Sequence, residues 1–277
     1  MPTPLRDRQG GKTRSLPATL PNYYTNAEVA ARYAKVRPFF HAEVARRLRE
    51  FAGVDRFQRV LDVGCGSGQS SMALAAIAGQ VIAIDASPSM LEQAPRRANI
   101  SYRLGLAEEL NVGGEFDLVT AGSALHWFDQ DRFFTRCREV LAPAGMLAVY
   151  NDHFTAYMRD VSACKHWMRD RFAKRFPQPW RGMRDLNETK AVKCGFEIAQ
   201  RVSFNHLVPF LREELIAYLL TRSNTLAAIA SGKETESGIV DWLESELASI
   251  VPDGVTGSFI FKCNLWTLRK ADDGESG

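Results

Sequence analysis

The sequence has few cysteines, and they form no pattern that predicts a disulfide framework or a metal site. The five are far apart, without a C-x-x-C pair or a histidine at metal-ligand spacing: Cys65, Cys137, Cys164, Cys194 and Cys263. We therefore expect reduced thiols, no bound metal and a cytoplasmic location. Cys65 lies within a glycine-rich stretch, where we expect a small packing residue rather than a nucleophile.

The chain also lacks long apolar runs and a strong net charge. No apolar run approaches the roughly 20 residues that span a bilayer, and the N-terminus has no hydrophobic segment typical of a secretory signal. The formal net charge is +3 over 277 residues, and like charges occur only in short pairs such as Arg46-Arg47. The sequence thus predicts a soluble protein without a membrane span and gives no indication of nucleic-acid binding.

What the sequence does contain is a strand that leads into a glycine-rich turn and a helix. The apolar strand at 60–63 includes Asp62, glycines follow at Gly64, Gly66 and Gly68, and a helix is expected over 69–77. Alternate glycines permit positive φ and close approach of a ligand, and the helix N-terminus favours a negatively charged group. A second strand ends at Asp85, about 20 positions after the first glycine, where a carboxylate can bind both ribose hydroxyls. This pattern predicts a nucleotide-like ligand.

The spacing of the glycines separates two ligand classes. A dinucleotide fingerprint, G-x-G-x-x-G, requires a third glycine at the position that Gln69 occupies. The chain instead has an acidic residue followed by G-x-G-x-G. An ordinary tight turn is the alternative, but it leaves the preceding Asp62 and the following Asp85 without an explanation.

The pattern resembles the first motif of class I S-adenosylmethionine-dependent methyltransferases, and further motifs follow in register over roughly residues 26–150. Residues 86–94 resemble the start of the family's second helix, with Ser87 as N-cap and Pro88 at the first helical position. Residues 124–129 (ALHWFD) resemble the HWF signature of the type 11 subgroup, which includes trans-aconitate methyltransferases. Residues 141–149 resemble the proline-glycine turn into the fifth strand.

This resemblance implies S-adenosylmethionine as cofactor, with S-adenosylhomocysteine as product. Residues 31–38 resemble a Y-x-x-x-R-P lid, in which Tyr33 would face the sulfonium cation and Arg37 the amino-acid carboxylate. An amphipathic helix with a core tyrosine and a solvated arginine is the alternative. The implied cofactor-binding residues are Tyr33, Arg37, Asp62, Gly64, Cys65, Gly66, Gly68, Asp85, Ala86, Met90, Ala107, Glu108, Ser123, His126 and Trp127.

One position departs from the family pattern. Leu106 stands just before Ala107-Glu108, where the family often places an acidic residue that binds the adenine amino group. Backbone groups or another side chain would then bind the adenine edge, or cofactor affinity would be reduced. Glu108 either contacts the cofactor or ties its loop to neighbouring backbone.

His126 follows the fourth expected strand and is the candidate catalytic residue, as a general base. A histidine that orients the loop is the alternative, and His153 after the fifth strand is a second candidate base. Trp127 is expected to form a wall of the cofactor pocket. Beyond residue 150, two sets of side chains favour an apolar and an anionic acceptor respectively: Phe154, Trp167, Trp180 and Phe204, and Arg159, Arg169, Arg171 and Arg181.

The predicted fold is a Rossmann-like α/β fold: a seven-stranded, mostly parallel sheet with an antiparallel last strand and an α-helical cap insertion. We expect a flexible tail (1–21), lid helices (22–50), a cofactor-binding core (51–150), a cap that also contributes one or two strands (151–257), a final strand (258–270) and a second tail (271–277). Within the cap, helical spacing is expected over 156–176, 212–221 and 239–250, and a short strand over 202–208.

The expected function is methyl transfer to a small-molecule acceptor such as a carboxylic acid or a hydroxyl compound. The alternatives are an aromatic or natural-product acceptor, or a protein that binds the cofactor without transferring its methyl group. The sequence leaves the acceptor atom and the oligomeric state open.

Overall fold

A computed structural model describes residues 23–158, 163–179 and 186–271, so the expected tail at 1–21 and residues 272–277 of the second tail lie outside it. Seven strands form one sheet in the order β3-β2-β1-β4-β5-β7-β6. Their bounds are β1 Phe57–Val63, β2 Ala78–Asp85, β3 Ile100–Leu104, β4 Phe116–Gly122, β5 Leu141–Met158, β6 Phe196–Phe210 and β7 Gly257–Lys270. β7 runs antiparallel to both of its neighbours, and the first five strands pair in parallel, which confirms the predicted fold class.

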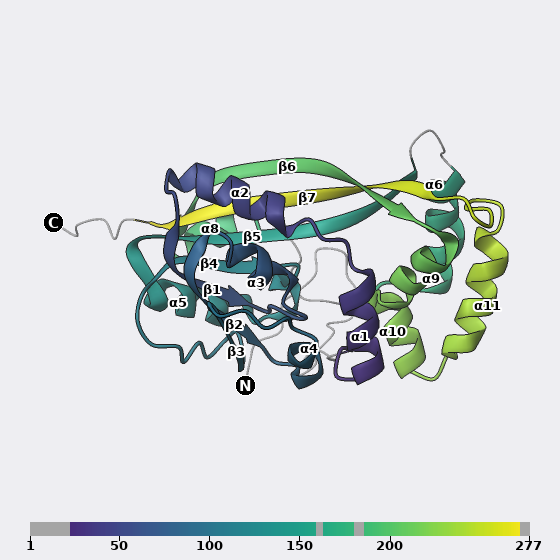
Figure 1. The fold of residues 1–277 in the computed structure, drawn as a ribbon, viewed down its shortest axis with the longest axis horizontal. Helices are drawn as coiled ribbons and strands as arrows, with labels where there is room; N and C mark the ends of the chain where they lie inside the picture. The colour runs from purple at the N-terminus through teal and green to yellow at the C-terminus, as the bar shows by residue number, and fades with distance from the viewer. Residues whose placement is uncertain (1–22, 159–162, 180–185, 272–277) are drawn as a thin grey trace, which may run out of the picture.

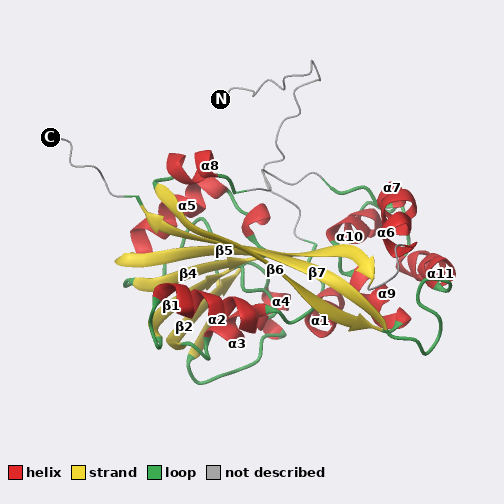
Figure 2. Cartoon of the chain, turned by 90° about the horizontal axis from the view of Figure 1, so that it is seen from above, coloured by secondary structure: helices red, strands yellow, loops and turns green. Residues whose placement is uncertain are grey.

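Helices cover both faces of the parallel part of the sheet (Figure 2). One face carries α2 (His41–Ala52) and α3 (Gln69–Leu74), and the other carries α5 (Gln130–Val140) and α8 (Glu188–Lys193). Because both faces are covered, the central residues of β1, β2 and β4 are mostly apolar and buried, with Leu61, Ile82 and Val119 among them. Ser87 caps α4 (Pro88–Glu92) and Pro88 opens it, as predicted.

The last three strands extend well beyond the parallel strands and carry a group of helices at their far end (Figure 1). These helices are α6 (Ala163–Trp167), a π-helical segment (Met168–Phe172), α7 (Ala173–Arg175), α9 (Arg212–Leu220), α10 (Ser223–Ala230) and α11 (Glu236–Leu247). They enclose a separate core around Phe172, Leu215, Leu243 and Phe259. We call these helices the cap.

Several expected bounds differ from the observed ones. The helix predicted from residue 69 ends at Leu74, because the next residues turn back into β2. Residues 156–158, expected to be helical, continue β5, because Tyr157 and Met158 pair with β7. The strand expected over 202–208 extends over all of β6, and α8 and α10 were not predicted. α8 packs on the parallel core instead of the cap, with Ala191 buried against the cluster around Phe134.

The N-terminal helix α1 (Ala27–Val36) lies between the core helix α4 and the cap helix α9 (Figure 1). On the core side, Ser87 Oγ donates to the Tyr24 carbonyl at 2.8 Å and Ser89 Oγ to the Thr25 carbonyl at 2.7 Å. On the cap side, Arg32 forms an ion pair with Glu236. The segment before and including α1 therefore joins the core to the cap.

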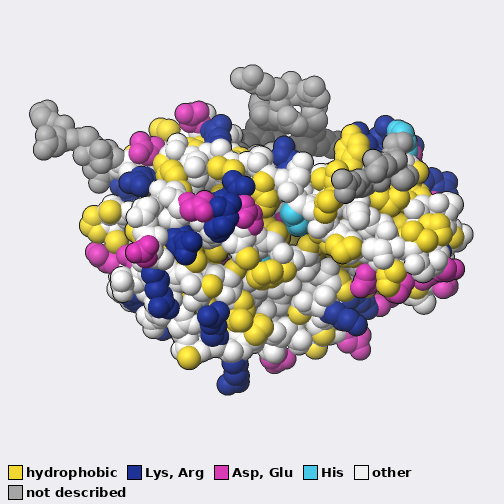
Figure 3. Space-filling view, turned by 45° about the horizontal axis from the view of Figure 1, so that its top comes forward, with side chains coloured by type: hydrophobic (Ala, Val, Ile, Leu, Met, Phe, Trp, Pro, Cys, Tyr) yellow, Lys and Arg dark blue, Asp and Glu magenta, His cyan; other side chains and the backbone are white. Residues whose placement is uncertain are grey.

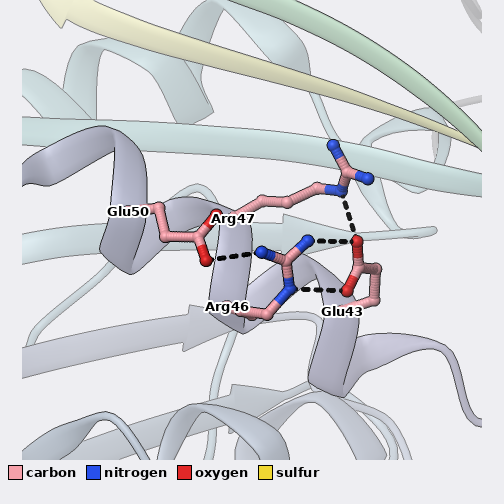
Figure 4. Close-up of polar contacts among 4 residues, drawn as sticks. All are labelled: Glu43, Arg46, Arg47 and Glu50. Atoms are coloured by element: carbon pink, nitrogen blue, oxygen red, sulfur yellow. Dashed lines mark hydrogen bonds and ion pairs between the residues drawn. The ribbon is translucent and has the colours of Figure 1, made fainter.

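The basic pair on α2 is neutralised within its own helix (Figure 4). Arg46 bonds to both carboxylate oxygens of Glu43, at 2.6 and 2.8 Å, and to Glu50, while Arg47 Nε donates to Glu43 at 2.7 Å. Such exposed pairs contribute only about 0–1 kcal/mol each. Figure 3 shows cationic and anionic side chains interspersed on that face of the molecule, without a large patch of one sign.

Among the described helices, none combines the length and the apolar character needed to cross a bilayer.

Candidate active site

The glycine-rich turn joins β1 to α3 at the carboxyl edge of the sheet. Gly64, Gly66 and Gly68 all have positive φ, of +69°, +54° and +79°. A Cβ atom on Gly64 would lie 2.5 Å from Ala124 Cβ, and one on Gly68 would lie 2.6 Å from Tyr102 Oη, so these two glycines are required by packing. A Cβ atom on Gly66 would meet only the end of a methionine side chain, at 3.0 Å, so this glycine borders open space.

Asp85 connects this turn to the start of α4. Its Oδ2 accepts a hydrogen bond from the Gly66 N–H at 2.8 Å, and its Oδ1 accepts one from the Ser87 N–H at 2.9 Å. Burial, with a smaller contribution from the charge of Asp62, raises the pKa of Asp85, and the N–H groups of Ser87 and Gly66, with a weaker contribution from Ala86, partly offset this rise. A carboxylate has about four acceptor positions, so Asp85 can accept two further hydrogen bonds, as a pair of vicinal ribose hydroxyls requires.

Asp62 lies beneath the turn and is fully buried. Its Oδ2 accepts hydrogen bonds from the hydroxyls of Ser70 and Ser71, both at 2.6 Å, and its Oδ1 accepts one from Thr120 at 2.8 Å. Burial raises its pKa, and the three hydroxyl donors lower it in part. Asp62 thus ties β1 to α3 and β4, and we assign it to positioning the turn rather than to direct contact with a ligand.

Cys65 is buried within the turn. Burial raises the pKa of its thiol well above the usual value, and the charges of Asp62 and Asp85 add to that effect. The thiol is therefore protonated at neutral pH and is a poor nucleophile. This agrees with a packing role.

The end of β3 presents two leucines next to Asp85. Leu104 is 64% exposed and is the register partner of Asp85, and Leu106 is 48% exposed. Two exposed leucines at the carboxyl edge of a sheet form an apolar surface that a flat aromatic ring could cover. Leu106 was noted in the sequence only as a departure from the family pattern, and Leu104 was not predicted at all. Their signal in the sequence is a large apolar residue placed just where a strand ends.

The remaining predicted cofactor-binding residues near this edge differ in their exposure to solvent. Ala86 is exposed, whereas Met90 and Ala107 are buried. Glu108 accepts a hydrogen bond from the Asp129 N–H at 2.7 Å and so holds the start of α5. This is the loop-tying role that was the alternative for Glu108.

A strained residue and a short 3₁₀ turn follow β4. Ser123 has a φ of +52°, unusual for a residue with a side chain, and its N–H donates to the Tyr150 carbonyl at 2.7 Å. The 3₁₀ turn Leu125–Trp127 then places His126, half-buried, with its ring 5.0 Å from the Trp127 ring. A cavity of about 70 Å³ lies here, lined by Ser123, Ala124, Leu125, His126, Val149, Tyr150, Asn151, His153, Leu186, Asn264 and Trp266. The structure thus brings the two candidate bases, His126 and His153, to one small cavity.

Arg37 at the end of α1 is bound to the cap. Its Nε donates to Thr221 Oγ1 at 3.0 Å and its Nη2 to the Thr221 carbonyl at 2.9 Å, while the guanidinium lies 4.5 Å from the Tyr33 ring centre and 5.1 Å from that of Tyr218. Burial acts to lower the pKa of Arg37, but the nearby tyrosines and Asp152 outweigh it, so the pKa is raised and the side chain stays charged. Arg37 is therefore not the solvated arginine of the alternative.

The same segment also contacts the glycine-rich turn. Gln69, the first residue of α3, donates to the Arg37 carbonyl at 3.3 Å. Tyr33 packs edge-on against Tyr24 at 5.2 Å, and Tyr24 in turn packs against Trp127 at 6.0 Å. Residues from α1, the turn and the 3₁₀ turn therefore surround one region at the carboxyl edge of the sheet.

Of the four arginines predicted to favour an anionic acceptor, the two that the structure describes are paired with acidic side chains. Arg169 is paired with Asp170 and Arg171 with Glu246, and both arginines are exposed. Trp167 is buried in the cap core, where its Nε1 donates to Glu246 at 2.9 Å. Trp180, Arg159 and Arg181 lie outside the described residues. Among the predicted apolar side chains, Phe154 packs against Tyr218 and Phe261, and Phe204 lies under Arg47 of α2.

Sequence reasoning missed a polar cluster on the α2 side of the long strands. His206 Nε2 lies 2.9 Å from Asp152 Oδ1, and His41 Nδ1 lies 3.2 Å from Tyr150 Oη. The partners are 54 and 109 positions apart in sequence, and no local motif connects them. In the part of the chain that the structure describes, no group of three or more His, Cys, Asp or Glu side chains could hold a metal ion.

Comparison with known proteins gives consistent similarities. Residues 60–145 match the family model described as a methyltransferase domain. The chain is 31% identical over 133 residues to a ubiquinone biosynthesis O-methyltransferase of Nitrobacter winogradskyi, a match that covers 45% of this chain and 49% of that protein. It is 36% identical over 110 residues to a trans-aconitate 2-methyltransferase of Deinococcus radiodurans, with 38% and 42% covered. The chain spans about half the length, or less, of the curated relatives it matches.

The fold itself recurs in solved structures. A protein of Anaeromyxobacter dehalogenans, assigned as a type II methyltransferase, superimposes with a TM-score of 0.64 at 22% identity. That alignment covers 84% of this chain and 97% of the other. At this level of identity the likeness concerns the fold alone, and it extends over the long strands and the cap as well as the parallel core.

Proposed function

We propose that the chain transfers a methyl group from S-adenosylmethionine to a small-molecule acceptor, because residues 60–145 match the methyltransferase domain family. The observation that carries this proposal is the position of Asp85. Its carboxylate joins Gly66 of the glycine-rich turn to Ser87 of α4 and retains acceptor capacity for two ribose hydroxyls.

The other residues at this edge fit the remaining parts of the cofactor. Leu104 and Leu106 offer an exposed apolar surface beside Asp85, which suits the adenine ring. Gly66, which borders open space, lets the chain approach the cofactor closely. Tyr33 and the charged Arg37, on α1, would cover the sulfonium and amino-acid end. When bound, S-adenosylmethionine supplies a methyl group on a sulfonium, which is already an activated electrophile.

The protein's task is then to hold the acceptor in line with that methyl group and to exclude water. The segment that bridges core and cap, α1, is suited to exclude water because it contacts α4 on one side and α9 on the other. His126 and Trp127, at the end of β4, are proposed to contact the cofactor or the acceptor from the α5 side of the sheet. The relatives include an O-methyltransferase and a trans-aconitate methyltransferase, so a hydroxyl or a carboxylate acceptor is the class we propose.

Isothermal titration with S-adenosylmethionine and S-adenosylhomocysteine tests the cofactor site. Gly66→Val places a branched side chain at the open side of the turn and should abolish detectable binding. Gly113→Val is the matched control, because Gly113 also has positive φ, of +63°, and lies before β4, at the opposite edge of the sheet. A Cβ atom on Gly113 would meet no atom of the described residues within 4 Å. If circular dichroism shows that Gly66→Val is folded and the variant still binds the cofactor as tightly as the parent, the assignment of the cofactor site is wrong.

Transfer is tested separately from binding. Release of S-adenosylhomocysteine is measured over a panel of hydroxyl, carboxylate and amine acceptors. Tight binding without release on any acceptor would favour the alternative, a cofactor-binding protein of this fold that does not methylate.

A further inference from the structure

A histidine and an aspartate form a pair on the α2 side of the long strands. His206 on β6 places Nε2 at 2.9 Å from Oδ1 of Asp152 on β5, and the two side chains are 20% and 9% exposed. An ionised carboxylate can only accept hydrogen bonds, so the pair fixes the proton of His206 on Nε2. Nδ1 is then the basic nitrogen of the ring.

The linker between α1 and α2 connects the pair to the proposed cofactor site. Residues 37–40 link α1 to α2, and the ring of Phe40 stacks on His206 at 5.5 Å. The charge of Asp152 is one of the contributions that raise the pKa of Arg37. The Arg37 carbonyl in turn accepts a hydrogen bond from Gln69, which directly follows the glycine-rich turn. One short linker therefore contacts both the turn and the histidine pair.

Titratable and charged groups from four elements lie around the His206–Asp152 pair. Asp152 and Tyr150 come from β5, Cys263 from β7 and His41 from α2, with Arg37 at the end of α1 and Arg47 of α2 over the neighbouring Phe204. Burial, with a smaller contribution from His206, lowers the pKa of His41 to about 3, so His41 stays neutral and does not take up a proton near pH 7. Burial raises the pKa values of Tyr150 and Cys263, which therefore keep their protons.

We propose that His206, oriented by Asp152, is the general base for methyl transfer to a hydroxyl acceptor. The inference rests on the proposed methyltransferase function. As the acceptor oxygen forms its bond to the methyl carbon, the carbon–sulfur bond breaks and its electron pair stays on sulfur. The hydroxyl proton passes to His206 Nδ1, and the resulting imidazolium is stabilised by Asp152. The proton later leaves to water.

The surroundings also indicate what kind of hydroxyl compound fits. Phe261 lies 5.5 Å from the His206 ring and 5.2 Å from Phe154, which in turn lies 5.5 Å from Tyr218. These rings pack against one another in the core of the cap, with Phe261 1% and Tyr218 3% exposed, and so make the surroundings of the base apolar and aromatic. A phenol, which combines a flat ring with an acidic hydroxyl, suits this combination better than an aliphatic carboxylate, which needs no base.

The first test reads the histidine directly in the full chain without cofactor. Nitrogen-15 NMR of the imidazole rings reports which nitrogen carries the proton. Assignment uses His206→Gln, with His166→Gln as the control at an exposed position on α6. We expect the Nε2–H tautomer for His206 in the parent, and a mixture of tautomers in Asp152→Asn. A parent that holds the proton on Nδ1 overturns the proposal.

The second test measures turnover with 3,4-dihydroxybenzoate as the phenol and trans-aconitate as the carboxylate. General-base assistance is worth about 10²–10⁴-fold, so His206→Gln should lower kcat for the phenol by at least about 100-fold with KM little changed. Asp152→Asn should lower kcat less, because the ring of His206 stays in place but loses the carboxylate that orients it. Asp152→Glu should restore part of the rate.

The outcomes separate the two proposals. His166→Gln should turn over as the parent does. Parent-like turnover of the phenol in folded His206→Gln, at every pH, overturns the base assignment while methyl transfer stands. If the parent releases no S-adenosylhomocysteine with any acceptor although it binds the cofactor, the proposed function fails and the base assignment fails with it.

Discussion

The two halves of the candidate site are built in different ways. The glycine-rich turn and Asp85 come from neighbouring parallel strands, and the Gly66–Asp85 hydrogen bond joins residues only 19 positions apart. The region where core meets cap is built from distant residues: Arg37 bonds to Thr221 across 184 positions, and Asp152 to His206 across 54. In the proposed function, the first half would bind the cofactor and the second half would set the acceptor.

Removal of the Asp62 carboxylate should have the largest effect on the turn. Asp62→Ala leaves three buried hydroxyls without their acceptor, and hydrogen bonds to a charged group contribute about 1.5–3 kcal/mol each. We expect the free energy of unfolding to fall by about 3 kcal/mol or more in urea denaturation. Asp62→Asn keeps an acceptor and should lose much less; an equal loss in both variants would show that the charge, not the hydrogen bonding, holds the turn.

The stability difference between the parent and Asp62→Asn should also depend on pH. Burial raises the pKa of Asp62 in the native state, so the native protein takes up this proton before the unfolded chain does as pH falls. The contribution of Asp62 to stability therefore improves as pH falls through the raised pKa toward the ordinary carboxyl value of about 4. Relative to Asp62→Asn, the parent should gain stability over this range, as measured by denaturation at a series of pH values.

Loss of Asp85 should weaken the cofactor half without unfolding it. Asp85→Ala removes the acceptor for two hydroxyls, and we expect affinity for S-adenosylhomocysteine to fall about 10–100-fold in titration calorimetry. The raised pKa of Asp85 means that the carboxylate takes up a proton above the ordinary carboxyl pKa of about 4. As pH falls, binding by the parent should therefore begin to weaken before a pH of about 4 is reached. Asp85→Asn should bind weakly with a flat pH dependence in this range. A parent without any such dependence would mean that Asp85 does not contact the ligand.

The core–cap contact should respond to cofactor through α1. Hydrogen exchange of residues 23–40 should slow when S-adenosylhomocysteine binds, whereas residues 243–247, at the end of α11 away from its Glu236 contact with α1, should change little. Thr221→Val removes the hydroxyl that accepts from Arg37 Nε and keeps the carbonyl contact, so it should weaken this protection only in part. Exchange in α1 that is identical with and without ligand would rule out a lid.

Substitution of Cys65 should have the smallest effect on cofactor binding. Its thiol is buried and protonated, so Cys65→Ala should change cofactor affinity by less than about twofold, and a thiol reagent such as iodoacetamide should leave the folded parent active. Rapid inactivation of the parent, prevented in Cys65→Ala, would show that the thiol is reactive.

The same contrast explains how much could be predicted from the sequence. The turn, the Ser87-Pro88 cap and the parallel strands were predicted because each depends on residues close together in the chain. The extension of β5 was not, because Met158 is held in a strand only by its pairing with Phe259 on β7. Polar residues alternate along β6, an edge strand with one exposed face, and therefore gave only a partial strand signal.

Individual site residues show the same limit. Arg37 was predicted as a cofactor ligand from its motif, but its bonds to Thr221 could not be read from a sequence in which that threonine has no distinguishing context. The His206–Asp152 pair had no motif at all, since it depends on the register of three antiparallel strands. Prediction was thus accurate where the chemistry is local and failed where strand pairing brings the groups together.

The most direct measurement is a crystal structure of the full chain with S-adenosylhomocysteine. We predict both ribose hydroxyls within hydrogen-bond distance of the Asp85 carboxylate, about 2.5–3.2 Å, with the adenine ring against Leu104 and Leu106 and the amino-acid end beneath Tyr33 and Arg37. The ligand bound elsewhere, or the ribose away from Asp85, would contradict this prediction.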